Sequence, residues 1–271
     1  MHIMCMGDSL STGTNGASTV ERTSSPRYAG RTIAEALGVR NAGGLSMAPA
    51  GPSSLSDRWG TTGTVGITLP YITMANTSTA TYTSEASGTT VDIWLSNASN
   101  TCSYQIDGGA SVPVTAGSGA QTLRKISVTG LADTTHVVKV TATANTVYLL
   151  GIAVTHTAGV AVHNLAYGGS RTVSGGAAVN WTDTGSGGLY VGRKATWDAG
   201  GITPDLFMLV IGGSDIFNGA TAAQAITGIT TMRNWYPDVD CIMVQAWEVP
   251  TTNLTTCDLY FVAKYELADT L

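Results

Sequence analysis

The sequence changes character twice along its length, and this change constrains the fold more than any single motif. Residues 1–60 and 157–271 alternate strand patterns with helical patterns, whereas residues 61–156 contain only short alternating runs separated by turns. Alternation of strands and helices predicts a parallel sheet covered by helices, and closely spaced short strands predict a β-sandwich. We therefore expect an α/β domain in two parts, interrupted at residues 61–156 by a β-sandwich of jelly-roll type.

Local signals place the expected elements. A helix should begin at Ser25-Pro26, carry an apolar stripe at Ala29, Ile33 and Leu37, and end at Gly38. Residues 41–60, which are rich in Gly, Ser and Pro, indicate a loop. Thr221 with Gln224 forms a capping box before another helix, and Thr255 with Asp258 opens a last one. Strands are expected at residues 3–6, 79–84, 91–95, 103–106, 126–128, 136–143, 147–154, 159–164, 206–211 and 241–244, with those at 206–211 and 241–244 fully buried. Asp107-Gly108-Gly109 suits a hairpin turn.

Composition excludes several classes of partner. Charged residues make up 11% of the 271 residues, the net charge is −5, and no run of Lys or Arg occurs, which argues against nucleic acid or an anionic membrane. No apolar run approaches the ~20 residues of a membrane span, and no secretory signal is visible. The four cysteines lie far apart without metal-type spacing. We expect neither a metal nor a cofactor, and reduced core cysteines, with a disulfide among them as the alternative.

Three short motifs each follow an expected strand. Gly7-Asp8-Ser9-Leu10 follows the first strand, a pair of glycines (Gly168-Gly169) follows the strand that ends at Asn164, and Gly212-Gly213-Ser214-Asp215 follows residues 206–211. Open α/β sheets bind ligands and carry out chemistry at the carboxyl ends of their strands. The three motifs should therefore meet at one edge of the sheet, where the hydroxyl of Ser9 would be presented to a ligand.

These motifs, in this order, resemble the SGNH hydrolase superfamily, also called GDSL esterases and lipases. The resemblance implies a flavodoxin-like three-layer α/β/α fold with Ser9 as the nucleophile, beside Asp8. It also implies that the N–H groups of Ser9 and Gly169, with Gly168 as the alternative glycine, stabilise the oxyanion of the tetrahedral intermediate. Ser214 stands where the family has Asn as a third donor, so it serves either as a weaker donor or only as a cap of the turn. Gly213 and Asp215 complete this motif.

The sequence departs from the family at its last motif, Asp-x-x-His, which supplies the acid and the base of the triad. No histidine follows residue 215, and residues 266–271 resemble the helix that precedes that motif. Asp133-Thr134-Thr135-His136 has the right spacing, but a turn followed by a strand explains it. His2, His156 and His163 are expected to be structural, with His163 the one that could reach the site. Whether the protein is an enzyme therefore stays open, and the 271 residues alone should be nearly inactive.

The inserted region resembles carbohydrate-binding jelly rolls, and similar inserts occur in polysaccharide acetyl esterases and in bacteriophage tail proteins. Trp94, Tyr82 and Tyr104 either stack on sugar rings or pack the core. One hypothesis is a serine esterase or deacetylase that acts on O-acyl groups of a cell-surface glycan or envelope material. The alternatives are an inactive tail or adhesion protein that binds host glycan and a purely architectural subunit. We expect an extracellular or virion-associated homo-oligomer, such as a trimer, with other tail subunits as further partners; a trimmed precursor would equally explain the absent signal.

Overall fold

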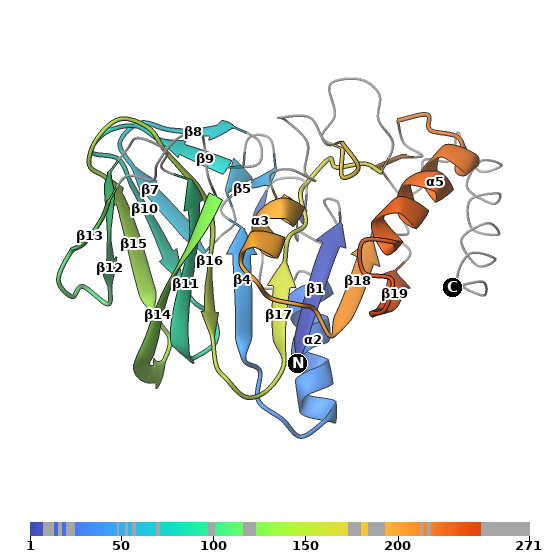
Figure 1. The fold of residues 1–271 in the computed structure, drawn as a ribbon, viewed down its shortest axis with the longest axis horizontal. Helices are drawn as coiled ribbons and strands as arrows, with labels where there is room; N and C mark the ends of the chain where they lie inside the picture. The colour runs from blue at the N-terminus through green and yellow to red at the C-terminus, as the bar shows by residue number, and fades with distance from the viewer. Residues whose placement is uncertain are drawn as a thin grey trace.

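One continuous sheet runs through most of the molecule (Figure 1). The computed structural model describes residues 1–7, 14–15, 18–19, 25–47, 49–51, 54–55, 58–68, 71–96, 101–115, 123–172, 180–183, 193–211, 214–215 and 218–244. The large sheet has ten strands, and its main path follows the order β14-β11-β16-β4-β17-β1-β18-β19. The fold is thus mixed and rich in sheet, with few helices.

The elements have the following bounds. The large sheet contains β1 (His2–Gly7), β4 (Gly43–Met47), β8 (Val65–Thr68), β9 (Tyr71–Met74), β11 (Gly88–Ser96), β14 (Leu123–Thr134), β16 (Val147–Thr155), β17 (Ala161–Asn164), β18 (Leu206–Val210) and β19 (Asp240–Val244). A second sheet of five strands contains β7 (Trp59–Thr62), β10 (Thr79–Thr83), β12 (Cys102–Ile106), β13 (Val112–Val114) and β15 (Val137–Ala142). Two small hairpins pair β2 (Thr14–Asn15) with β3 (Ser18–Thr19), and β5 (Pro49–Gly51) with β6 (Ser54–Leu55). The helices are α2 (Ser25–Ala36), α3 (Ala195–Ala199) and α5 (Ala222–Arg233).

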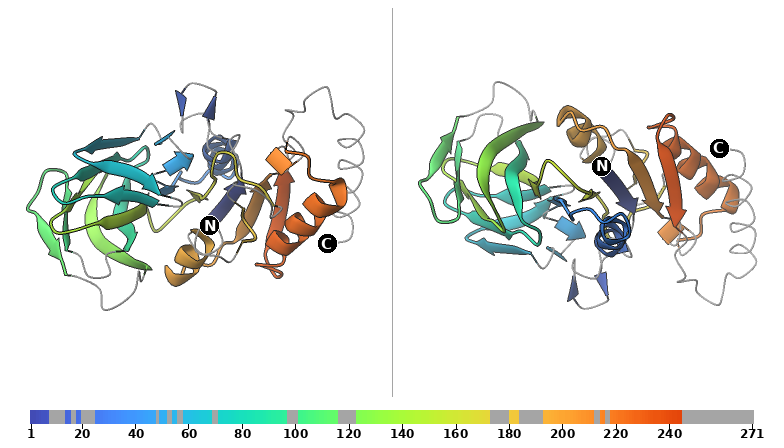
Figure 2. Two further views of the ribbon diagram at one scale, coloured as in Figure 1. Left: turned by 90° about the horizontal axis from the view of Figure 1, so that it is seen from above. Right: turned by 90° about the horizontal axis from the view of Figure 1, so that it is seen from below.

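The parallel part of the large sheet has β1 at its centre. Met4 of β1 lies opposite His163 of β17 on one side and Phe207 of β18 on the other, and all of these strands run in the same direction. Alternate residues of β1 face opposite sides: Ile3 packs with Ala34 of α2, whereas Met6 belongs to the cluster that contains residues of α3 and α5. Figure 2 shows α2 on one side of this part of the sheet and α3 and α5 on the other.

Strand β4 joins the parallel strands to the strands of the β-rich region, and the expectation of a loop at residues 41–60 is wrong here. β4 pairs antiparallel with β16 and parallel with β17. Its first two residues are glycines in the left-handed region, and their neighbours lie too close for side chains. A Cβ on Gly43 would lie 2.1 Å from the carbonyl oxygen of Val154, and one on Gly44 would lie 1.9 Å from that of Val162. Glycine at this place therefore signals the close approach of neighbouring strands rather than a loop.

The β-rich region consists of two sheets packed face to face. Strands β8, β9, β11, β14 and β16 of the large sheet and the five-stranded sheet contribute to one core, which includes Tyr82, Ile93, Val138 and Leu149. The strands expected at 79–84, 91–95, 103–106, 126–128, 136–143 and 147–154 are confirmed. The hairpin turn at Asp107 is also confirmed, since Asp107 and Gly108 have φ values of +53° and +71° and Gly109 donates its N–H to the carbonyl of Ile106.

The aromatic residues of this region are packed rather than free to stack on sugars. Trp94 is 1% exposed and Tyr82 is 2% exposed, and Tyr104 packs half-buried against the sandwich core. Tyr82 of β10, in the five-stranded sheet, belongs to the core of the sandwich. Trp94 of β11, in the large sheet, belongs to the other cluster, which contains Trp197 of α3. For Trp94 and Tyr82 the sugar-stacking interpretation is therefore wrong, because alternation along a strand does not reveal that both faces of the strand are covered.

Three other expectations need correction or confirmation. Leu37 is 60% exposed, because helix α2 ends at Ala36 and Ala34 takes the buried position against the sheet. Ile242 is 43% exposed, so the expectation of a fully buried strand at 241–244 is wrong. Among the described strands β19 lies at the edge of the sheet and pairs with β18 alone.

Cys5, Cys102 and Cys241 are free thiols, as expected. Cys257 and the helix expected from Thr255 lie outside the described residues.

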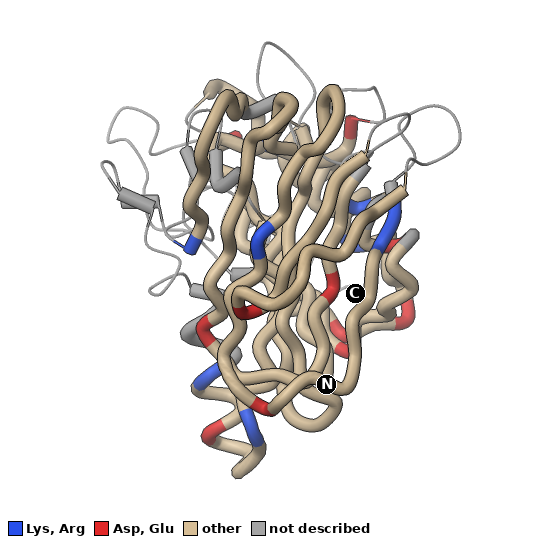
Figure 3. Tube along the Cα trace, turned by 90° about the vertical axis from the view of Figure 1, so that its left-hand side faces the viewer, with Lys and Arg blue, Asp and Glu red and all other residues tan. Residues whose placement is uncertain are grey.

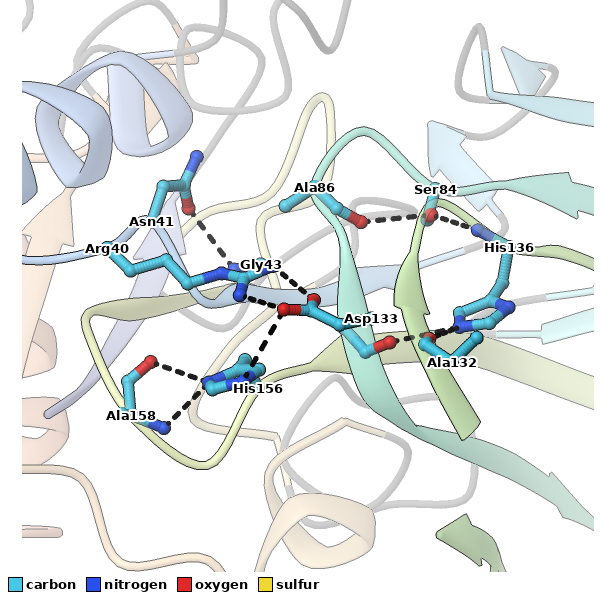
Figure 4. A network of polar contacts seen from close by, with 11 residues as sticks. Arg40, Asn41, Gly43, Ser84, Ala86, Ala132, Asp133, His136, His156 and Ala158 are labelled. Atoms are coloured by element: carbon cyan, nitrogen blue, oxygen red, sulfur yellow. Dashed lines mark hydrogen bonds and ion pairs between the residues drawn. The ribbon is translucent and has the colours of Figure 1, made fainter. Parts of the chain in front are cut away.

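A polar network ties the β-rich region to the parallel strands at their amino ends (Figure 4). Arg40, which precedes β4, forms an ion pair with Asp133 at the end of β14, and Nε2 of His156 lies 3.9 Å from the same carboxylate. Figure 3 shows few Lys, Arg, Asp or Glu positions along the strands that lie toward the viewer. None of the described helices combines the length and the apolar character that a membrane crossing requires.

Candidate active site

The described carboxyl ends of β1 and β17 are joined by hydrogen bonds. The carbonyl oxygen of Gly7 accepts the N–H of Tyr167 at 3.0 Å and the hydroxyl of Ser170 at 2.9 Å. The Ser170 oxygen also accepts the indole N–H of Trp181 at 3.0 Å, so the hydroxyl is held from both sides. Gly7 is the residue before Asp8, and the segment after β17 therefore fixes the point from which the Gly-Asp-Ser motif departs. Asp8 and Ser9 lie outside the described residues.

Residues 167–170 form a tight turn, here called the glycine turn. Ser170 donates its N–H to the carbonyl of Tyr167 at 3.1 Å. Gly169 has a φ of +77° and is exposed, and an added Cβ would meet no atom within 4 Å, whereas Gly168 is buried. In the described part of the chain no hydrogen bond involves the N–H of Gly169. Of the two glycines considered, Gly169 is thus the one whose N–H is available to a ligand.

The segment after β18 holds the segment after β17 through one carboxylate. Asp215 is fully buried, and its two oxygens accept the N–H of Thr172 at 2.9 and 3.1 Å and the Thr172 hydroxyl at 3.1 Å. Gly228 of α5 packs directly on Thr172, with room for no side chain between them. Asp215 therefore links the segment after β18 to the segment after β17.

Ser214 is half-buried beside Asp215, in a short helical turn. Its carbonyl oxygen accepts the backbone N–H of Asn218 at 3.3 Å and the side-chain amide of Asn218 at 2.6 Å. Gly213 lies outside the described residues. Gly7 thus ends β1, Gly169 follows β17, and Ser214 and Asp215 follow β18. These three parallel strands are neighbours in the sheet.

Arg193, which sequence reasoning did not single out, lies beneath the glycine turn. Its guanidinium is 1% exposed, donates to the carbonyl oxygens of Leu165 and Ala166, and lies with its Cζ 4.8 Å from the ring centre of Tyr167. Burial lowers the pKa of Arg193 to about 9, which leaves the side chain charged at neutral pH. Burial also raises the pKa of Tyr167 to about 12. No pattern in the sequence marks this arginine, because it lies 26 residues after Tyr167 in a stretch without a motif.

All four histidines of the chain lie among the described residues, and none of them follows the carboxyl end of a parallel strand. His163 is fully buried within β17: its Nδ1 accepts the N–H of Leu45 at 3.2 Å, so its Nε2 carries the proton and donates to Nδ1 of His2 at 3.0 Å. His2 is at the start of β1, the end of the strand opposite to Gly7. The expectation that His2 and His163 are structural agrees with these contacts.

The Asp133–His136 spacing does not form a pair. Asp133 binds Arg40, whereas Nδ1 of His136 lies 2.6 Å from Asp107 and its Nε2 lies 3.0 Å from the carbonyl oxygen of Gly88. Both residues lie in the β-rich region, but Asp133 belongs to the end of β14 rather than to a turn, and His136 directly precedes β15. Within the described ranges, no group of His, Cys, Asp and Glu side chains is arranged to hold a metal ion.

The fold of this chain is similar to that of a solved esterase structure. A peptidoglycan O-acetylesterase matches with a TM-score of 0.61 at 12% sequence identity, covering 98% of this chain and 75% of that one. The chain therefore shares the overall fold of that structure. A family two carbohydrate esterase from Cellvibrio japonicus (TM-score 0.34, 10% identity, 84% of this chain and 86% of that one) and one from Clostridium thermocellum (0.30, 13%, 81% and 82%) match too weakly to establish a shared fold. No protein-family model and no curated protein sequence matches the chain.

Proposed function

We propose that this protein is a serine esterase of the SGNH type that removes O-acyl groups from a glycan. The observation that carries the proposal is the glycine turn: an exposed, unengaged Gly169 N–H is tied through Tyr167 and Ser170 to Gly7, two residues before Ser9. A serine hydroxyl beside a preorganised backbone donor is the arrangement that acyl transfer requires.

The order of the parallel strands supports a flavodoxin-like three-layer form of this fold. Leaving out β4, the strands β1, β17, β18 and β19 follow each other in the chain and lie in the sheet as β17-β1-β18-β19. This is the order 2-1-3-4, the first part of the flavodoxin-like order 2-1-3-4-5. We propose that the β-rich region between β4 and β17 is an insertion into that fold and that its two sheets have a jelly-roll ancestry.

The proposed reaction begins when the Ser9 hydroxyl attacks the carbonyl carbon of an ester. The carbonyl oxygen becomes an oxyanion that accepts the N–H groups of Gly169 and Ser9, with the Ser214 hydroxyl as a third donor. The proton lost by the Ser9 hydroxyl passes to the glycan oxygen, which leaves as a hydroxyl, and water then hydrolyses the acyl-serine and releases the carboxylic acid. Attack also requires a base that takes this proton, and none of the four histidines follows the carboxyl end of a parallel strand.

The test is hydrolysis of p-nitrophenyl acetate, followed by acetate release from O-acetylated peptidoglycan and from O-acetylated xylan. We expect turnover that Ser9→Ala abolishes and that Ser111→Ala, which alters an exposed serine of the β-rich region, leaves intact. N-acetyl groups of the same polymers should not be cleaved. Turnover that survives Ser9→Ala, or none at all, would contradict the proposal. Glycan binding without turnover would favour the non-enzymatic adhesion protein, whose extracellular or virion location and oligomeric state stay predictions from the sequence.

A further inference from the structure

Arg193 is a buried cation that donates hydrogen bonds to the backbone of the candidate site. It is 1% exposed, and its guanidinium donates to two consecutive carbonyl oxygens, those of Leu165 and Ala166. These are the two residues between the end of β17 at Asn164 and the glycine turn. Burying a charged side chain costs several kcal/mol before its interactions offset that cost. Local features that are costly to the fold are expected mainly at functional sites.

The contacts of Arg193 restrict the path of the chain into the turn. The planar guanidinium donates along fixed directions, so two carbonyls bound to it are held in one relative orientation. The next residue, Tyr167, lies with its ring against the same guanidinium, at 4.8 Å from Cζ to the ring centre. Leu165 and Tyr167 also donate their N–H groups to the carbonyls of Cys5 and Gly7, at 2.9 and 3.0 Å. The N–H groups of this segment are therefore bound by β1, and its carbonyl groups are bound by Arg193.

We propose that Arg193 is a positioning residue for the oxyanion donor: it holds residues 165–167 so that the N–H of Gly169 keeps its position at the carboxyl end of β17. This inference rests on the proposed function. It assigns to Arg193 no contact with substrate, because the side chain is buried. The positive charge of Arg193 also stabilises negative charge at this edge of the sheet, and acyl transfer develops negative charge on the carbonyl oxygen of the ester.

Lys194 supplies a matched control. It is the neighbouring residue, it is also buried at 6% exposure, and it also lies over aromatic rings. Its ammonium, however, contacts Asp198 at 2.6 Å and the rings of Trp235 and Tyr236, which connect α3 to the chain after α5. Lys194→Met should therefore destabilise the protein without moving the glycine turn.

The first measurement is amide hydrogen exchange at Leu165, Tyr167 and Ser170 in the full protein. Arg193→Met should accelerate exchange at these amides by about tenfold or more relative to Lys194→Met. In the wild type, local opening must break the hydrogen bonds from Arg193 to the carbonyls of Leu165 and Ala166, and in Arg193→Met these bonds are absent. Arg193→Lys, which keeps a charged donor, should restore slow exchange. Where Arg193→Met does not fold, Arg193→Gln takes its place, since an amide can still donate to one carbonyl. Exchange in Arg193→Met or Arg193→Gln equal to that in Lys194→Met would overturn the proposal.

The second measurement separates positioning from general destabilisation. With p-nitrophenyl acetate, Arg193→Met should lower kcat by about tenfold to a hundredfold, as a misplaced catalytic group does, and leave KM unchanged. Lys194→Met should leave both constants unchanged at a temperature where it is folded. Equal kcat values for the wild type and Arg193→Met would overturn the proposal. If the wild type has no turnover, the proposed function fails, and the exchange measurement alone decides whether Arg193 holds the turn.

Discussion

The carboxylate of Asp215 binds Thr172 at three points, through the backbone N–H at 2.9 and 3.1 Å and through the hydroxyl at 3.1 Å. Asp215 follows β18 and Thr172 follows β17, and in the sheet these strands lie on either side of β1. The Asp215 carboxylate thus connects the segments that follow the two neighbours of β1 in the sheet. Both residues are buried, so their interaction is protected from water.

Asp215→Asn should lower the free energy of unfolding by about 1–3 kcal/mol, because the amide can accept at one atom only and leaves a buried donor of Thr172 without its acceptor. Urea denaturation monitored by tryptophan fluorescence measures this. Asp238→Asn, at an exposed aspartate, is the control and should leave the transition midpoint unchanged. A wild-type midpoint for Asp215→Asn would show that the carboxylate does not hold the two loops.

Gly228→Ala should disturb the same contact from the opposite side. A Cβ at Gly228 would lie 2.4 Å from Cβ of Thr172 and 2.5 Å from its hydroxyl oxygen, and overpacking of this kind costs about 1–3 kcal/mol. Gly60→Ala, where a Cβ would meet nothing within 4 Å, is the matched control. The double variant with Asp215→Asn should be less destabilised than the sum of the single variants, since both act on Thr172. Strict additivity would mean that the two contacts are independent.

Tyr167→Phe should leave the free energy of unfolding unchanged or raise it by about 1 kcal/mol, because it removes a buried hydroxyl that needs an acceptor. Among the described residues the Tyr167 hydroxyl has no hydrogen-bond partner, while the ring packs in the core and against Arg193. Thermal or urea denaturation provides the comparison with the wild type. A loss of stability above 1 kcal/mol would reveal a bond to this hydroxyl.

His136 should make the β-rich region sensitive to pH. Both ring nitrogens face acceptors, Nδ1 the Asp107 carboxylate at 2.6 Å and Nε2 the carbonyls of Gly88 and Ala132 at 3.0 and 3.1 Å, so the ring is held as an imidazolium. Burial lowers the pKa of His136, but the hydrogen bonds and the charge of Asp107 outweigh it, and the pKa is raised above 6.5. Burial raises the pKa of Asp107, and the hydrogen bonds from Val137 and His136 bring it below 3.8.

The signs of these two shifts define the window of greatest stability. A histidine with a raised pKa contributes its full stabilisation below 6.5 and loses it as the pH rises through its pKa in the folded state. An aspartate with a lowered pKa contributes above 3.8 and loses it as the pH falls. Urea midpoints should therefore fall as the pH rises above 6.5, and Asp107→Asn should flatten that slope. An equal slope in the wild type and in Asp107→Asn would contradict the assignment.

Most of the strands could be predicted from the sequence, because the spacing of apolar residues along a strand reflects which of its faces are buried in the fold. The parallel strands around residues 3–6 and 206–211 and the strands of the β-rich region all occur where alternation or continuous apolar runs placed them. The resemblance to SGNH hydrolases pointed to Gly169. The structure gives this residue a left-handed φ and an exposed position, and its role as an oxyanion donor stays a prediction.

What the sequence could not predict depends on contacts between distant segments. Gly43 and Gly44 resemble loop residues, yet they lie in a strand because Val154 and Val162 approach them closely. Trp94 resembles an exposed stacking residue, yet it packs in the core cluster that contains Trp197. Arg193 has no local signal at all, because its significance comes from the carbonyls of Leu165 and Ala166, 28 and 27 positions earlier.

We propose a serine esterase site at the edge of the sheet after β1 and β17. Treatment of the native protein with a fluorophosphonate, followed by peptide mass spectrometry, locates the reactive serine. We expect one adduct on the peptide that contains Ser9, absent in Ser9→Ala and present in Ser111→Ala. An unmodified Ser9 peptide, or an adduct that persists on that peptide in Ser9→Ala, would contradict it.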